Sequence, residues 1–79
     1  MKVEIWTRET PPCVYCEVSK KLLESKGLSY INKVIGRDID RDFAVNSTGQ
    51  KTVPMVFIDD QMIGGFDQLR SYLLSKDLS

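Results

Sequence analysis

The only two cysteines of the chain, Cys13 and Cys16, lie three positions apart and directly follow two prolines. Such a pair can exchange disulfides, supply two ligands of a metal site or form a structural disulfide. On a helix, residues i and i+3 share a face, and their α-carbons lie about 5 Å apart, within disulfide reach. The pair therefore allows three chemistries, and the rest of the chain must decide between them.

Two of these chemistries, metal binding and a structural disulfide, are disfavoured by the other residues of the chain and by the short spacing of the pair. A structural zinc site needs four ligands, and the chain has no second cysteine pair and no histidine. No metal is therefore expected, unless a second copy or borrowed thiols complete a site. A disulfide across so short a loop removes little chain entropy, and it is not expected in a reducing cytoplasm. Redox exchange is favoured, because the pair opens a helix directly after a strand.

Cys13 is predicted to be the attacking thiol and Cys16 the resolving thiol. At the first turn of a helix, unpaired N–H groups and the helix dipole stabilise a thiolate, which lowers the pKa of Cys13 below the free value of about 8.5. Cys16, more buried inside the helix, would then release the mixed disulfide. Arg8 lies close upstream, and the sequence leaves open whether it adds positive potential near Cys13 or is a solvated surface charge.

The elements that must position the pair alternate between strands and helices. Strands are predicted at 2–6, 30–35, 55–58 and 62–63, and helices at about 13–26, 38–48 and from 66 onward. The predicted apolar helix positions are Val14, Val18, Leu22 and Leu23 in the first helix, and Ile39, Phe43 and Ala44 in the second. Gly49 is predicted to end the second helix, and Asp59–Asp60 to form the turn before the last strand. The order β-α-β-α-β-β-α predicts an α/β fold, with a four-stranded mixed sheet and helices on both faces.

Length and composition predict one small domain over residues 1–79. The chain is 42% hydrophobic and 28% charged, with 11 basic and 11 acidic residues. This balance gives no indication of a nucleic-acid or membrane partner. No apolar run approaches the roughly 20 residues that span a bilayer, and the N-terminus lacks the apolar segment of a signal peptide. We expect a cytoplasmic monomer.

Two stretches of the chain resemble the glutaredoxin family. The run "VEIWTRETPPCVYCEVSKKLL" is similar to the family's first strand, active-site loop and first helix, and "GQKTVPMVFIDDQMIGGFDQL" to its second signature. The strings "CVYC" and "GGFDQLR" are particularly similar to the small glutaredoxins of T-even-type bacteriophages, which would place the protein in a host cytoplasm. The resemblance implies a thioredoxin-like fold and a dithiol glutaredoxin. Such a protein uses glutathione to reduce protein disulfides, with ribonucleotide reductase as a plausible client, and glutathione mixed disulfides.

The resemblance also implies a set of glutathione-binding residues. The set is Arg8, Tyr15, Gln50, Lys51, Thr52, Val53, Pro54, Gly65, Phe66 and Asp67. In the family, a cis Val53–Pro54 bond presents the Val53 backbone to the substrate, and the helix start at Gly65 and Asp67 holds the γ-glutamyl end. The residues alone favour a plainer interpretation of Pro54, as the start of a strand. Asp67 can cap the helix as well as meet a ligand, and Phe66 can be an anchor of the core.

The glycine carboxylate of glutathione needs a cationic or amide partner, for which Arg8, Gln50 and Lys51 are the candidates that the resemblance implies. Surface cations are otherwise usually solvated. The chain departs from the commoner family motif in having Val14, not proline, after the first cysteine, and in a longer loop before it. The two prolines of that loop are predicted to form a stiff, extended lead into the helix.

Two other functions stay open. One is a redoxin electron donor that thioredoxin reductase reduces; such donors also have valine after the first cysteine. They carry glutamine where Tyr15 stands, however, and an aromatic-Ser-Gly-Phe string where this chain has 64–66, so the resemblance favours glutathione. The other is a non-catalytic protein that binds glutathione or an iron-sulfur cluster through Cys13 in a dimer.

Overall fold

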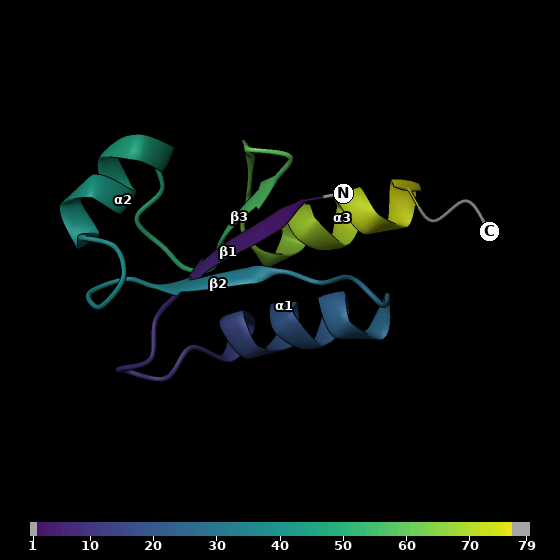
Figure 1. Cartoon of the computed structure of the whole chain (residues 1–79), viewed down its shortest axis with the longest axis horizontal. Helices are drawn as coiled ribbons and strands as arrows, with labels where there is room; N and C mark the ends of the chain where they lie inside the picture. Colours follow the sequence, from purple (N-terminus) through teal and green to yellow (C-terminus); the bar gives the residue numbers. More distant parts are fainter. Residues whose placement is uncertain (1, 77–79) are drawn as a thin grey trace.

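The computed structural model describes residues 2–76, which form a mixed sheet with three helices (Figure 1). The elements are β1 (Val3–Thr7), α1 (Val14–Ser25), β2 (Ile31–Val34), α2 (Arg41–Thr48), β3 (Met55–Ile58), β4 (Gln61–Gly64) and α3 (Phe66–Lys76). The strand order is β2-β1-β3-β4, with β1 parallel to β2 and antiparallel to β3, and β3 antiparallel to β4. The predicted element order and mixed sheet are confirmed.

The two faces of the sheet are buried by different helices. On one face α1 and α3 complete the main core, formed by Val3, Ile5, Leu23, Val56, Ile58, Leu69 and Leu73. On the other face α2 contributes to a smaller cluster, formed by Trp6, Ala44 and Met55 with half-buried Ile35, Ile39, Phe57 and Met62 around it. Alternation along β1 sends Ile5 to the first face and Trp6 to the second. Helices on both faces were predicted.

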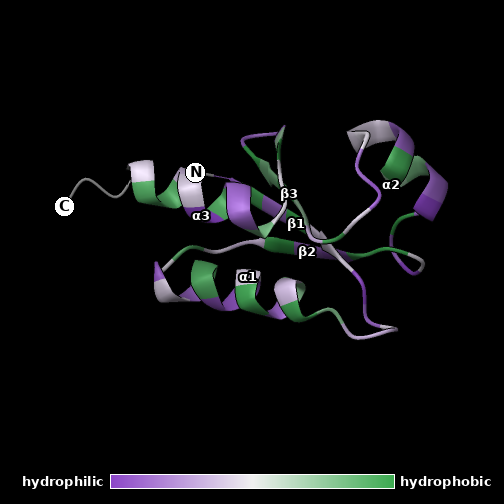
Figure 2. Cartoon of the chain, turned by 180° about the vertical axis from the view of Figure 1, so that it is seen from behind, coloured by the Kyte–Doolittle hydropathy of each residue, from purple (hydrophilic) through white to green (hydrophobic). Residues whose placement is uncertain are grey.

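The buried face of α1 differs from the predicted one. Cys16, Ser19 and Leu23 are the buried residues, whereas Val14 is 72% exposed and Val18 is also exposed. At 3.6 residues per turn, Val14 lies about two and a half turns before Leu23 and so points to the opposite side. The buried row of α1 is therefore the one that carries Cys16. Figure 2 shows hydrophobic and hydrophilic residues alternating along this helix.

Helix α2 begins at Arg41, three residues later than predicted. Its N-cap is Asp40, whose carboxylate accepts from Phe43 N at 3.2 Å, while Asp38 accepts from Val34 N at 2.8 Å and belongs to the preceding turn. Phe43, predicted to be buried, is 59% exposed, whereas Ala44 is buried as predicted. The helix ends at Gly49, in the left-handed conformation, as predicted.

The strands match the predicted ones with small shifts at their ends. β2 is shorter than predicted by one residue at each end, and β4 extends one residue further on both sides. Asp59 and Asp60 form the predicted turn of the β3–β4 hairpin, both with positive φ, a conformation that Asp tolerates better than most residues. In the described part of the chain no helix is both long and apolar enough to cross a membrane.

Candidate active site

Cys13 and Cys16 form a disulfide at the beginning of α1, with α-carbons 5.2 Å apart, close to the predicted separation. Cys13 was predicted to lie in the first turn of the helix but is its N-cap, one position before the observed first turn, and its Sγ accepts from Cys16 N at 3.1 Å. Cys13 is 7% exposed and Cys16 is fully buried. The same backbone N–H would stabilise a thiolate on Cys13 once the disulfide is reduced.

The two prolines before Cys13 do not form the extended lead that was predicted. Residues 9–12 form a turn, with a cis Thr10–Pro11 bond. Arg8 closes this turn, because its Nε donates to the Pro11 carbonyl at 2.9 Å. Glu9, within the turn, pairs with Arg37 at 3.2 Å and so ties the turn to the loop before α2.

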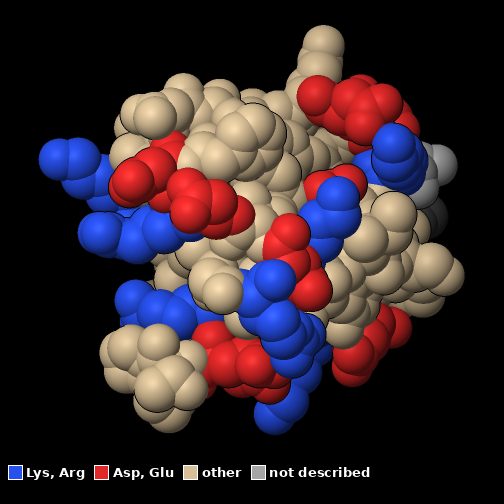
Figure 3. Space-filling view, turned by 60° about the vertical axis from the view of Figure 1, so that its left-hand side comes forward, with Lys and Arg blue, Asp and Glu red and all other residues tan. Residues whose placement is uncertain are grey.

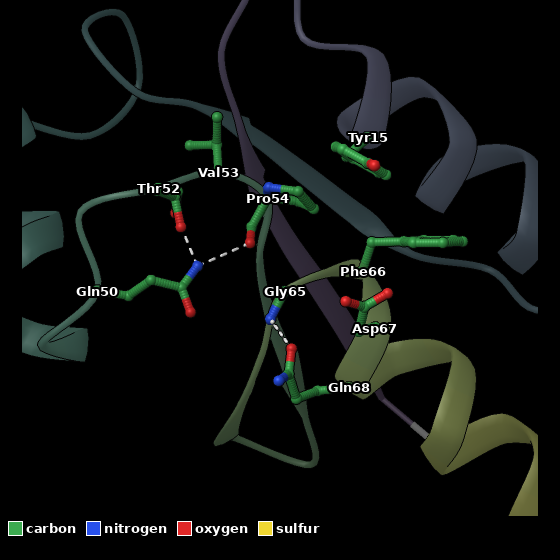
Figure 4. Close-up of a pocket in the computed structure, with 9 residues that line it drawn as sticks. All are labelled: Tyr15, Gln50, Thr52, Val53, Pro54, Gly65, Phe66, Asp67 and Gln68. Carbon is green, nitrogen blue, oxygen red and sulfur yellow. Dashed lines mark hydrogen bonds between the residues drawn. The ribbon is translucent and has the colours of Figure 1, made fainter.

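The segment Thr52–Pro54 lies against the cysteine pair. Its Val53–Pro54 bond is cis, as the resemblance implied, and the Val53 carbonyl lies 3.9 Å from Cys13 Sγ. Gln50 holds the segment on both sides of Val53, because its Nε2 donates to the Thr52 carbonyl at 2.7 Å and to the Pro54 carbonyl at 3.0 Å (Figure 4). Val53 N–H makes no hydrogen bond to another described residue and is available to an extended ligand.

The start of α3 forms a second backbone site. Leu69 N donates to Gly65 O at 3.0 Å, so Gly65 is the N-cap, and Gln68 Oε1 accepts from Gly65 N at 3.0 Å. This is one half of a capping box, in which the side chain at the third helical position reaches back to the cap. The N–H groups of Phe66 and Asp67 belong to the first turn and have no acceptor within the helix, which suits an anionic group.

Gln68 is a site residue that sequence reasoning missed. The signal was its spacing, three residues after Gly65, because Gln at that position is typical of a capping box. The side chain also packs on Gly64, which has φ +125°, and a Cβ added there would lie 2.7 Å from Gln68 Cγ. Gly64 therefore lets Gln68 fold back over the turn.

The Thr52–Pro54 segment and the start of α3 enclose a cavity of about 420 Å³, which we call the α3 cavity (Figure 4). It is lined by Tyr15, Gln50, Thr52, Val53, Pro54, Gly65, Phe66, Asp67 and Gln68. The rings of Tyr15 and Phe66 pack together with centroids 5.7 Å apart and form one wall. Phe66 is half-buried and belongs to neither hydrophobic cluster, so the interpretation of it as a core anchor was wrong.

Arg8 and Lys51 are the predicted binding residues that do not line the α3 cavity. They line a neighbouring cavity of about 330 Å³, the α2 cavity, together with Arg41 of α2 and with Val53, which both cavities share. Val53 therefore separates the basic side chains of Arg8 and Lys51 from the start of α3. Figure 3 views the molecule from the side on which α2 lies, and basic and acidic side chains interleave there.

Among residues 2–76 no group of three or more His, Cys, Asp or Glu side chains could hold a metal ion. The polar groups that line the α3 cavity include backbone N–H donors, side-chain amides and one carboxylate acceptor, that of Asp67. In Figure 4 this carboxylate lies near Gly65, below the Phe66 ring. The arrangement can bind an extended peptide-like ligand by its backbone while presenting one of its sulfurs to Cys13.

Comparisons with known proteins agree on one family. The glutaredoxin family model matches residues 3–63. Glutaredoxin 3 of Escherichia coli K12 is 47% identical over 68 residues, which cover 85% of this chain and 80% of that protein. A crystal structure of a buckwheat glutaredoxin–glutathione complex superposes with a TM-score of 0.81 at 29% identity, covering 96% of this chain and 71% of that chain. Glutaredoxin 1 from Francisella tularensis, complexed with cacodylate, gives 0.74 at 28% identity, covering 95% and 94%.

Proposed function

The chain belongs to the glutaredoxin family and has its thioredoxin-like fold, and on that premise we propose that it is a dithiol glutaredoxin reduced by glutathione. The observation that carries this proposal is the contact of 3.9 Å between Cys13 Sγ and the Val53 carbonyl. It brings the cysteine pair to the edge of a cavity lined by free backbone donors and one carboxylate. We further propose protein disulfides, including that of ribonucleotide reductase, and glutathione mixed disulfides as substrates.

The reaction follows from the different surroundings of the two sulfurs. The Cys13 thiolate attacks a client disulfide, the client S–S bond breaks, and the departing client thiolate takes up a proton. The Cys16 thiolate then attacks Cys13 Sγ, the mixed disulfide breaks, and the second client thiolate leaves. The protein now holds the Cys13–Cys16 disulfide, and two electrons have passed to the client.

Glutathione returns the protein to the dithiol form in two exchanges. A first glutathione thiolate attacks Cys13 Sγ, which forms a mixed disulfide and releases Cys16 as a thiolate. A second glutathione thiolate attacks the sulfur of the bound glutathione, which leaves as glutathione disulfide and restores the Cys13 thiolate. Each exchange breaks one S–S bond and forms another, so no further reductant is needed.

We propose that glutathione lies along the α3 cavity in an extended conformation. Its cysteinyl residue pairs with the Val53 backbone, its γ-glutamyl carboxylate meets the first-turn N–H groups of α3, and Asp67 meets its ammonium group. Its glycine carboxylate then points past Val53 towards Arg8 and Lys51 in the α2 cavity. The buckwheat complex, in which a glutaredoxin with this fold holds glutathione, supports the proposal.

Gln50 has a different role from the one that the resemblance implied. Its Nε2 already donates to two backbone carbonyls of this chain, so that group is not free for a glycine carboxylate. We assign it to positioning the Val53 backbone. Arg8 is also partly engaged, through Nε, but its terminal guanidinium nitrogens make no hydrogen bond to a described residue.

The test is a coupled assay with two arms. The oxidised protein receives either glutathione with glutathione reductase or thioredoxin reductase, and NADPH consumption is followed with a small disulfide substrate. We expect turnover in the glutathione arm, and its absence there would refute the proposal. Turnover only with thioredoxin reductase would identify the redoxin alternative, and a coloured dimer without turnover would identify the cluster-binding one. Assignment to the phage subgroup, and with it to a host cytoplasm, stays a proposal.

A further inference from the structure

Ser19 is a buried hydroxyl without a hydrogen-bond partner among the described residues. It is fully buried, and its Oγ neither donates nor accepts. Other hydroxyls on the helices behave differently: Ser25, Thr48 and Ser75 donate to a carbonyl three or four residues earlier, at 2.7, 2.8 and 3.1 Å. An orphan polar group in the core costs free energy, and a partner that appears in another state of the protein would explain why it is kept.

The geometry of the helix indicates which group that partner is. Ser19 follows Cys16 by three residues, and both belong to the buried row of α1. Side chains on a helix lean towards its N-terminus, so the Ser19 side chain is directed towards the turn that carries Cys16. The other buried polar side chain in the described part of the chain, Thr7, already donates to Asn32 Oδ1 at 2.8 Å.

The acceptor strength of the Cys16 sulfur depends on its redox state. In the disulfide the Cys16 sulfur is held by Cys13, and the Ser19 hydroxyl makes no hydrogen bond to it. A neutral sulfur does accept elsewhere, as Met55 Sδ does from Thr48 Oγ1 at 3.6 Å. Opening the disulfide frees the Cys16 side chain to change rotamer and meet the Ser19 hydroxyl. In the reduced protein the sulfur becomes a thiolate whenever Cys16 resolves a mixed disulfide. A hydroxyl that donates to an ionised acceptor makes a bond roughly twice as strong as a neutral one. The reduced state therefore offers the Ser19 hydroxyl a strong acceptor that the oxidised state lacks.

We propose that Ser19 is a positioning residue for the resolving cysteine: its hydroxyl donates to the Cys16 sulfur when the bond to Cys13 is open. This inference rests on the proposed dithiol function. In the resolving step the Cys16 thiolate attacks Cys13 Sγ, the Cys13–client bond breaks, and its electron pair leaves with the client thiolate, which takes up a proton. Ser19 keeps its own proton throughout.

Two measurable effects follow. Ser19 stabilises the reduced form relative to the disulfide, so it makes the protein a weaker reductant. It also increases the thiolate fraction of Cys16 at neutral pH. A tenfold larger fraction is partly offset by an about threefold lower nucleophilicity, which leaves resolution about threefold faster.

The decisive variant is Ser19→Ala, with Ser25→Ala as its matched control on the exposed side of the same helix. Each protein is equilibrated with a dithiothreitol redox buffer, so the measurement does not depend on which reductant the protein uses in turnover. For Ser19→Ala we expect an equilibrium shifted about tenfold towards the disulfide, which is about 30 mV for a two-electron couple. The Ser25→Ala equilibrium should match that of the unmodified protein.

A second readout is the pH dependence of thiolate absorbance at 240 nm in a Cys13→Ser background, where Cys16 is the remaining thiol. Adding Ser19→Ala should move this titration to higher pH. Ser19→Thr keeps the hydroxyl, so its redox equilibrium should stay close to that of the unmodified protein even if the extra methyl group destabilises the fold.

An unchanged equilibrium and an unchanged titration in Ser19→Ala would overturn the proposal and leave Ser19 as a small residue chosen for packing. A shift in Ser19→Thr as large as in Ser19→Ala would overturn it too, because the hydroxyl would then be irrelevant. Failure of the glutathione arm of the coupled assay would refute the proposed function alone, since the dithiothreitol equilibrium would still report on Ser19.

Discussion

Replacing Gln50 with alanine should weaken substrate binding while leaving both cysteines in place. The Gln50 Nε2 group donates to the carbonyls of Thr52 and Pro54 at 2.7 and 3.0 Å, and these carbonyls bracket Val53. Without the amide, nothing else in the described chain holds the two carbonyls in this orientation. Val53 would then sample orientations that do not match an extended ligand.

The magnitude follows from the two lost hydrogen bonds. Each is worth about 0.5–1.5 kcal/mol net, and the Thr52 end is exposed, so we expect a total of about 1–2 kcal/mol. A substrate must restore the ordered segment when it binds. The KM for a glutathione mixed disulfide should therefore rise about 5–30-fold, the factor that corresponds to this energy. The value of kcat should change much less, because Gln50 does not touch the reacting sulfurs.

The assay is steady-state deglutathionylation with glutathione and glutathione reductase, together with urea unfolding. Gln61→Ala is the control, because Gln61 is exposed on β4 and its side chain makes no hydrogen bond to a described residue. Gln50→Glu is the sharper variant, since an ionised carboxylate cannot donate to either carbonyl and should raise the KM at least as far. If Gln50→Ala retains the KM of the Gln61→Ala control, the positioning role is wrong.

The remaining predictions concern the cysteines, one glycine and one carboxylate. Cys16→Ser should keep deglutathionylation and lose dithiol reduction of protein disulfides, whereas Cys13→Ser should lose both; equal losses would refute the division of roles. Gly64→Ala should lower the free energy of unfolding in urea by about 1–3 kcal/mol, because Gly64 has a positive φ and the Gln68 side chain packs on it. Gly27→Ala should cost less, because a Cβ added to Gly27 would meet no other atom within 4 Å. A hydrogen bond from the backbone N–H of Val34 in β2 lowers the pKa of Asp38 below the ordinary value of 3.8. The ionised Asp38 carboxylate therefore contributes its full stabilisation above pH 3.8, and this stabilisation is lost as the pH falls through the lower pKa of the folded state. The stability difference between the protein and Asp38→Asn should therefore shrink below pH 3.8, and a difference independent of pH would contradict this.

The sequence predicted those features correctly for which a residue type has few possible structural roles in its local pattern. The spacing of Cys13 and Cys16 predicted their shared helix face, and Gly49 and the Asp59–Asp60 pair predicted a helix end and a turn. The start of α2 was missed because Asp38 and Asp40 are equally good N-caps by type. The difference lies in tertiary structure, since the carboxylate of Asp38 is already engaged by the end of β2.

The parts of the site that sequence reasoning missed are side-chain amides that close on nearby backbone. Gln50 was predicted as a ligand group, yet it holds two carbonyls of its own chain, and Gln68 was not predicted at all. Such bonds depend on loop geometry, which neither periodicity nor residue type specifies. The rotation of α1 was missed for a related reason, because the most apolar row of the helix is not the row that carries Cys16.

The two walls of the α3 cavity meet at Gly65. A Cβ added there would lie 3.5 Å from the Pro54 carbonyl, 3.7 Å from Gln68 Oε1 and 4.0 Å from Gln50 Nε2. Groups from the Val53 segment and from the start of α3 thus lie within 4.0 Å of the same point beside Gly65. Loosening either wall should therefore disturb the other, so the effects of Gln50→Ala and Gln68→Ala on KM should not add.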